Sequence, residues 1–239
     1  MVEEMATGPV SFYDERVLPR CVDLMCANPG MEKWRRRAVE GLSGTVVEIG
    51  FGSGANVELL PDDVTRVYAV EPSGLARRRS AEHIRVATER RGGEHRLMVE
   101  HVGIDGQSLP LDDSSCDGAL ATFTLCTIPD VSRALAEVHR VLRPGGRFHF
   151  LEHGASPDAS VRRWQHRLEP AQRRLGGGCH LTRVPAELVE DAGFRIDHVE
   201  QRYAKGPKPW SWFTVGHAVR LDDGRIDLRD IPPDHEETA

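Results

Sequence analysis

The chain has 239 residues, 39% of them hydrophobic, and its 31 Lys and Arg residues against 37 Asp and Glu residues give a formal net charge of −6. This length suits one large domain or two small ones with a sizeable core. The acidic balance argues against a dedicated nucleic-acid binder, because such proteins carry excess positive charge to meet phosphates. We therefore expect no nucleic-acid partner.

The N-terminal sequence MVEEMATGPV is acidic and lacks the apolar core of a signal peptide. No apolar stretch approaches the roughly 18 residues needed to cross a bilayer. The cysteines are scattered without a CxxC pair, so the pattern predicts neither a metal centre nor a disulfide framework. We expect a cytoplasmic protein with reduced thiols and no integral membrane segment. The five cysteines are Cys21, Cys26, Cys116, Cys126 and Cys179.

Two helices are expected near the N-terminus, at Ser11–Cys26 and, after the Asn28-Pro29-Gly30 break, at Met31–Glu40. Residues 1–43 would thus form a helical cover. The run of basic residues Arg35–Arg37 is interpreted as a solvated helix face, with contact to an anionic surface as the alternative.

Strand-like and helix-like segments then alternate, which predicts a mostly parallel sheet with helices on both faces. Two further strands, separated only by a short loop, should pair antiparallel. Residues 44–220 would form this α/β domain, and the charged residues 221–239 a flexible tail. The expected parallel strands are Thr45–Ile49, Arg66–Val70, Leu97–Val102, Gly118–Thr122 and Arg147–Leu151; the helices are Ala55–Leu60, Gly74–Arg91 and Val131–Leu142; the antiparallel pair is Phe194–Gln201 and Trp212–Arg220.

The segment VVEIGFGSGAN, residues 46–56, places three glycines on alternate positions directly after a strand. Glycine permits positive φ and lets a ligand approach the backbone, so this pattern favours a nucleotide site over a plain tight turn. GFGSGA also fits the dinucleotide pattern G-x-G-x-x-G/A. Glu71 at the end of the second strand suits a ribose hydroxyl in either a dinucleotide or S-adenosylmethionine.

Later segments separate these alternatives. The motif E-x-G-x-G-x-G from Glu48, D-x-x-x-LP from Asp105, and EVHRVLRPGG at residues 137–146 occur in an order that resembles the class I S-adenosylmethionine-dependent methyltransferases. The resemblance covers about residues 44–154. It implies a Rossmann-like, seven-stranded, mostly parallel sheet with the last strand antiparallel, and S-adenosylmethionine as cofactor.

The resemblance also implies roles for individual residues around the cofactor. The glycine loop would pass under the methionine part, Glu48 would support the loop or face the ammonium group, and Glu71 would accept from the ribose hydroxyls. Asp105 and the Gly106 N–H would meet the adenine, and Thr122 would line the methionine pocket, with Asn56 as a weaker candidate. The cofactor-binding residues expected are Glu48, Gly50, Gly52, Gly54, Glu71, Asp105, Gly106 and Thr122.

Three flanking segments indicate a smaller group within these methyltransferases. FYDERVLP, FLEHG and GGGCHLTR, at residues 12–19, 150–154 and 176–183, are similar to bacterial type 11 or "phospholipid" methyltransferases and to the mammalian alkyl thiol methyltransferases. The hydrophobic N-terminal anchor of the mammalian proteins has no counterpart here. This difference argues against the membrane attachment of the mammalian proteins, while peripheral membrane contact and the oligomeric state stay open.

Five residues are candidates for the acceptor side. Glu152 and His153 end the fifth strand, where successive side chains point to opposite faces, and we name both as candidate catalytic residues. His153 is read either as a general base or as a hydrogen-bonded strand-end histidine. Cys179 is read either as a buried small residue or as a reactive one. Tyr13, Cys179 and Arg183 are the candidate substrate contacts, and Arg183 alternatively ties its loop to an acid.

The expected reaction is methyl transfer from S-adenosylmethionine to a small molecule, with a thiol favoured as acceptor. The donor is already activated, so the transfer itself requires no metal, and a thiol already gives some thiolate at neutral pH. The alternatives are a lipid-headgroup N-methyltransferase, a quinone-type C- or O-methyltransferase, and a non-catalytic S-adenosylmethionine-binding regulatory protein.

Overall fold

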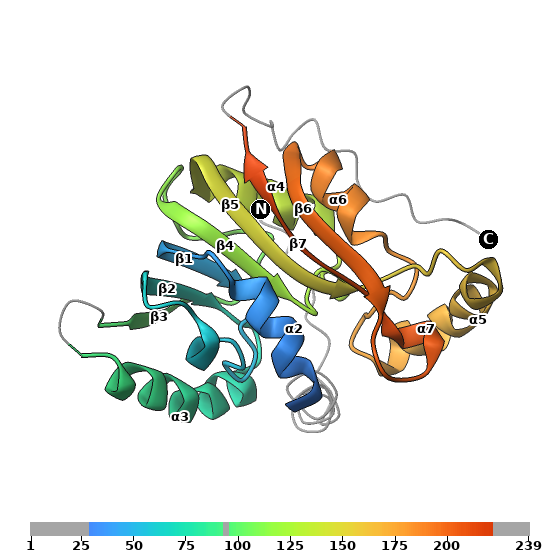
Figure 1. Cartoon of the computed structure of the whole chain (residues 1–239), viewed down its shortest axis with the longest axis horizontal. Helices are drawn as coiled ribbons and strands as arrows, with labels where there is room; N and C mark the ends of the chain where they lie inside the picture. Colours follow the sequence, from blue (N-terminus) through green and yellow to red (C-terminus); the bar gives the residue numbers. More distant parts are fainter. Residues whose placement is uncertain (1–28, 93–95, 222–239) are drawn as a thin grey trace, which may run out of the picture.

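The computed structural model describes residues 29–92 and 96–221, which form one twisted sheet of seven strands with the order β3-β2-β1-β4-β5-β7-β6 (Figure 1). The first five strands in this order are mutually parallel, and β7 runs antiparallel to both of its neighbours. The predicted seven-stranded fold is confirmed. The strands are β1 (Gly44–Ile49), β2 (Val64–Val70), β3 (Met98–Gly103), β4 (Cys116–Thr122), β5 (Leu142–His153), β6 (Phe194–Tyr203) and β7 (Trp212–Arg220).

The helices cover both faces of the sheet, and each face has its own apolar core. Neighbouring residues of one strand, such as Val46 and Val47, belong to different cores because side chains alternate along a strand. One core includes α4 and α6, and the other includes α2 and α3 (Figure 1). The helices are α2 (Pro29–Val39), α3 (Gly74–Arg90), α4 (Val131–Val141), α5 (Ala159–Leu175), α6 (Pro185–Asp191) and α7 (Lys208–Ser211).

Two predictions differ clearly from the structure, each for a local reason: the type of one helix and the start of one strand. The helix expected at Ala55–Leu60 is only a short 3-10 helix, η2 (Val57–Leu59), because Leu60 precedes a proline and is extended. β5 begins at Leu142 instead of Arg147, because Leu142 already pairs with Cys116 of β4 before an irregularity in the ladder.

The N-terminal part is described only from residue 29 onward. The expected helix at Met31–Glu40 is present as α2, whereas the one at Ser11–Cys26 and Tyr13 lie outside the described residues. α2 packs through Trp34 against Phe213 of β7, and the Ala38 carbonyl accepts a hydrogen bond from His149 Nδ1 at 2.8 Å. The proposed tail also lies outside, apart from residue 221. Nowhere in the described ranges is a helix long and apolar enough to cross a membrane.

Candidate active site

The carboxyl ends of β1 to β5 lie on one edge of the sheet, because these strands are parallel. Open α/β sheets bind their ligands at this edge. The structure therefore places several residues expected from the sequence along the same edge, each at or just after the end of a different strand. They are Gly50, Glu71, Asp105, Thr122 and His153.

The glycine loop after β1 has a backbone that only glycine adopts easily. Gly50, Gly52 and Gly54 have φ values of +68°, +58° and +82°. A Cβ atom built on Gly50 would lie 2.1 Å from Oγ1 of Thr124, so the loop lies directly against the segment that follows β4. A Cβ on Gly52 would instead meet only the Gly50 carbonyl oxygen, at 3.9 Å. The loop is thus packed tightly on one side and open at its middle glycine.

Glu71 connects the glycine loop to the end of β2. Its carboxylate accepts hydrogen bonds from the backbone N–H groups of Gly52 and Ser73, both at 2.8 Å. Both oxygens of this carboxylate thus take part in fixing the two loops, one at Gly52 and one at Ser73. The structure therefore explains why an acid follows β2 in this motif: its carboxylate also fixes the loop after β1.

A buried polar cluster lies beneath this loop. Asn56 Nδ2 donates to Glu48 Oε1 at 2.7 Å and to Thr122 Oγ1 at 2.9 Å. Arg35 of α2 donates through Nη1 to Asn56 Oδ1 at 2.9 Å and to Thr122 Oγ1 at 2.8 Å. The expectation of a solvated Arg35 is wrong, since only 6% of this residue is exposed and its guanidinium lies over Phe123. The helical charge pattern alone could not distinguish Arg35 from its exposed neighbour Arg36.

We expect Glu48 to make folding stability depend on pH. Burial raises the pKa of Glu48 from 4.5 to about 8, outweighing the Asn56 hydrogen bond and the attraction of Arg35. The folded state therefore holds a proton that the unfolded state releases, so this stabilisation is complete below pH 4.5 and is lost as the pH rises to about 8. Relative to Glu48→Gln, the wild type should lose up to about 1.4 kcal/mol per pH unit in that window. Urea unfolding at several pH values measures this difference, and parallel stability curves would contradict it.

The loop after β3 carries the two residues expected at the adenine. Asp105 is exposed, and its Oδ1 atom accepts from the Gln107 backbone N–H at 2.8 Å and from Gln107 Nε2 at 3.0 Å. Gly106 lies over the end of β1, where an added Cβ would meet Ile49 at 3.7 Å. Both residues are placed at the ligand edge, and their contact with adenine stays a prediction.

Glu152 and His153 point to opposite faces of β5, as the alternation of strand side chains requires. Glu152 is fully buried, and its Oε1 atom accepts from the backbone N–H groups of Thr124 and Leu125 at 2.8 and 2.9 Å. Burial raises the pKa of Glu152 to about 7, against the effect of these two bonds. Glu152 therefore fixes the start of the loop after β4.

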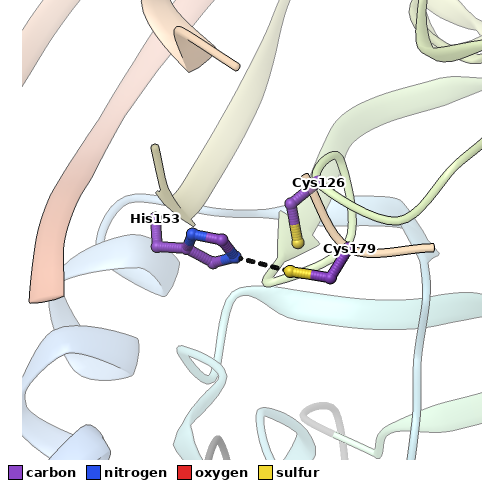
Figure 2. Close-up of side chains that lie close together, drawn as sticks. All are labelled: Cys126, His153 and Cys179. Carbon is purple, nitrogen blue, oxygen red and sulfur yellow. Dashed lines mark hydrogen bonds between the residues drawn. The ribbon is translucent and has the colours of Figure 1, made fainter. Parts of the chain in front are cut away.

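His153 faces a pair of cysteines from two other segments (Figure 2). Its Nε2 atom lies 3.1 Å from Sγ of Cys179, in the connection between α5 and α6, and Cys126 from the loop after β4 completes the group. The Cys126 and His153 hydrogen bonds hold the pKa of Cys179 well below its ordinary value. Cys126 was not a sequence candidate, because nothing near it in the chain signals chemistry. Only the fold brings it to the other two.

Arg183 donates to three backbone carbonyls of the loop after β4. Its Nη1 atom donates to the carbonyl oxygens of Leu125 and Ile128 at 2.6 and 2.7 Å, and Nη2 donates to that of Pro129 at 3.2 Å. The predicted substrate contact of Arg183 stays a prediction. Its observed contacts join the GGGCHLTR segment to the loop that carries Cys126.

Replacing Arg183 by lysine should therefore destabilise the protein by about 1–3 kcal/mol, because one ammonium group cannot reproduce the fork that meets three carbonyls. The matched change Arg174→Lys on the exposed side of α5 should have almost no effect. Urea unfolding of both variants measures the difference. Equal midpoints would show that the carbonyl contacts contribute nothing to stability.

These features define the class of protein. A glycine loop after β1, an acid after β2 and a seven-stranded sheet with an antiparallel β7 are the features that the resemblance to class I S-adenosylmethionine-dependent methyltransferases implied. A family model described as "Methyltransferase domain" matches residues 47–150. Among solved structures, an S-adenosylmethionine-dependent methyltransferase from Methanosarcina mazei superposes with a TM-score of 0.58 at 24% identity, covering 75% of this chain and 93% of that one.

Curated relatives give the family. Thiol S-methyltransferase TMT1B of Homo sapiens is 32% identical over 199 residues, which cover 80% of this chain and 78% of the human protein. Demethylmenaquinone methyltransferase of Thermobifida fusca is 34% identical over 158 residues, covering 64% of this chain and 59% of that one. The chain therefore belongs to the S-adenosylmethionine-dependent methyltransferases that include TMT1B, and it is an enzyme with S-adenosylmethionine as its cofactor.

Proposed function

We propose that this enzyme transfers the methyl group of S-adenosylmethionine to the sulfur of a small hydrophobic thiol. The choice of a thiol as acceptor rests on the extent of the similarity to human TMT1B, which covers four fifths of the chain. The methyltransferase domain itself matches only residues 47–150, so this similarity reaches beyond the cofactor half into the segments that would meet an acceptor.

Two features of the described residues fit S-adenosylmethionine. Gly52 leaves open space above the loop, where a side chain would otherwise stand. Glu48 Oε2 is buried without a hydrogen-bond partner in the described part of the chain, so one oxygen of this carboxyl group is placed to meet a polar cofactor group beneath the loop. The residues proposed to hold the cofactor are Glu48, Gly50, Gly52, Gly54, Glu71, Asp105, Gly106 and Thr122, with Asn56 and Arg35 positioning Thr122 and Glu48.

When bound, S-adenosylmethionine supplies a methyl group on a sulfonium, which a nucleophile displaces in line with the breaking bond. On the acceptor side we place His153 and Cys179, which lie together at the end of β5, and Tyr13 and Arg183 as further contacts. Glu152 acts on the site through the backbone of the loop that begins at Thr124. His153 lies beside Cys126 and Cys179, whose polarizable sulfur atoms suit a soft sulfur nucleophile.

A quinone-type methyltransferase is the second candidate, favoured by the similarity to the Thermobifida fusca demethylmenaquinone enzyme. That similarity covers a smaller share of both chains than the similarity to TMT1B. We further propose a cytoplasmic location, which the free thiols of Cys116, Cys126 and Cys179 support. Peripheral contact with a membrane would accompany a lipid acceptor.

Formation of S-adenosylhomocysteine by the purified protein tests the proposal. The acceptors are an alkyl thiol, a hydroquinone and phosphatidylethanolamine vesicles, each with and without enzyme. Product formed only with the thiol supports S-methylation, and product formed only with another acceptor replaces it by the quinone or lipid alternative. Binding of S-adenosylmethionine by calorimetry without turnover of any acceptor would favour a regulatory binding protein.

A further inference from the structure

Cys126, His153 and Cys179 form a compact group of potential metal ligands. Their Sγ, Nε2 and Sγ atoms all lie within 4.8 Å of one another, and the side chains point toward a common centre (Figure 2). Cys126 and Cys179 are buried, with 4% and 7% of each residue exposed. Cysteine sulfur and histidine nitrogen are the ligands that Zn²⁺ prefers, with bonds of about 2.3 and 2.0 Å. Three such atoms at this spacing can reach one ion with small side-chain adjustments.

The backbone holds these three residues in place independently of their side chains. The His180 N–H donates to the carbonyl oxygen of Cys126 at 2.8 Å, which ties the two cysteine segments together. Arg183 donates to the carbonyl of Leu125, and Glu152 accepts from the N–H of the same residue. The ligand positions are therefore set before any ion binds, as a specific metal site requires.

Cysteine binds metals as the thiolate, so binding of the ion would release the thiol protons of Cys126 and Cys179 to solvent.

The group lies next to the glycine loop. Thr124, two residues before Cys126, is the side chain against which Gly50 packs. In the described part of the chain, no fourth histidine, cysteine or carboxylate joins the three ligands. Three protein ligands with one open position are the arrangement of catalytic zinc sites, whereas structural sites use four.

We propose that Cys126, His153 and Cys179 bind one zinc ion, or a divalent ion of similar chemistry, whose fourth tetrahedral position takes the acceptor sulfur. The identity of the fourth ligand rests on the proposed thiol methyltransferase function. The acceptor thiol binds as thiolate and releases its proton to solvent. Its sulfur forms a bond to the methyl carbon while the bond from that carbon to the sulfonium breaks, with the electron pair staying on S-adenosylhomocysteine. The oxidation state of the metal does not change during the transfer. Its role is to hold the nucleophile as thiolate.

The first test measures metal binding without turnover. The full chain is stripped of metal with a chelator under reducing, anaerobic conditions and titrated with Co²⁺, then with Zn²⁺ in competition. We expect one Co²⁺ per chain, with the visible bands of tetrahedral cobalt and a sulfur-to-cobalt charge-transfer band. Zn²⁺ should abolish these bands at one equivalent. Absence of such a stoichiometric spectrum overturns the site.

Variants assign the ligands. Cys126→Ser and Cys179→Ser should each remove the tetrahedral spectrum, and the matched change Cys116→Ser, at the buried start of β4, should leave it intact. Cys126→His keeps a ligand at that position, so it should still bind Co²⁺ but with a weaker charge-transfer band. This variant keeps the test valid if a serine variant fails to fold. A spectrum that survives both serine changes overturns the assignment.

A final titration separates the metal site from the proposed function. Adding an alkyl thiol to the cobalt protein should strengthen the charge-transfer band as two cobalt–sulfur bonds become three. Full thiol methylation by metal-free protein would overturn the role of the ion and keep the thiol activity. A cobalt spectrum unchanged by thiol, with no thiol turnover, would overturn the proposed function and the fourth ligand and keep the three-residue site.

Discussion

Replacing Gly50 by alanine should destabilise the protein by about 3 kcal/mol, a large part of a typical folding free energy of 5–15 kcal/mol. Two costs add. An alanine at a φ of +68° carries a backbone penalty of about 1–2 kcal/mol. Its Cβ atom would also lie 2.1 Å from Oγ1 of Thr124, and such overpacking costs about 1–3 kcal/mol. Urea unfolding of the cofactor-free protein measures the sum.

Gly52→Ala is the matched control, since it adds the same atom in the same loop. Gly52 has a similar φ of +58°, but its Cβ would meet nothing closer than a carbonyl oxygen at 3.9 Å. We expect only the backbone penalty of about 1–2 kcal/mol here. The open space at Gly52 is where we place the cofactor, so this variant should bind S-adenosylmethionine at least about tenfold more weakly. Equal stability losses in the two variants would contradict the packing of Gly50 on Thr124.

Glu71→Gln should weaken S-adenosylmethionine binding by about 10- to 100-fold. The carboxylate accepts from the N–H groups of Gly52 and Ser73, and a glutamine would present its NH₂ group to one of these donors. Losing one hydrogen bond to a charged group costs about 1.5–3 kcal/mol, and 1.4 kcal/mol corresponds to tenfold in affinity. The proposed contact with the ribose hydroxyls would weaken as well.

Calorimetry of the purified variant with S-adenosylmethionine measures this effect. The matched control is Glu100→Gln on the neighbouring strand β3, where the carboxylate is half exposed and pairs with Arg66 at 3.3 Å. Surface ion pairs of this kind contribute about 0–1 kcal/mol, so the control should bind the cofactor normally. Wild-type affinity in Glu71→Gln would remove Glu71 from the cofactor site.

The cofactor half could be predicted from local sequence because its determinants are short and sequential. The alternation of apolar strands with amphipathic segments predicts the layers, and Gly50, Gly52 and Gly54 require a backbone that few other residues adopt. Glu71 and Asp105 follow strands whose carboxyl ends meet at one edge of any parallel sheet. Their places in the sequence therefore nearly determine their places along that edge.

Other features depended on packing between distant segments. Arg35 has the pattern of an exposed helix face, yet α2 lies so that its side chain reaches Asn56 and Thr122. One further difference was local: the helix expected at Ala55–Leu60 shortens to η2, because Leu60 is held extended before Pro61.

The sequence by itself determined the fold class and the residues along the ligand edge of this methyltransferase, because hydrophobic period and glycine chemistry act within a few neighbouring residues. Only the tertiary structure decided that Cys126 joins His153 and Cys179, which come from separate loops and a strand end. It also decided that Arg183 binds the carbonyls after β4. Such contacts join residues that are far apart in the sequence. They depend on how whole strands and loops pack together, which no pattern of neighbouring residues determines.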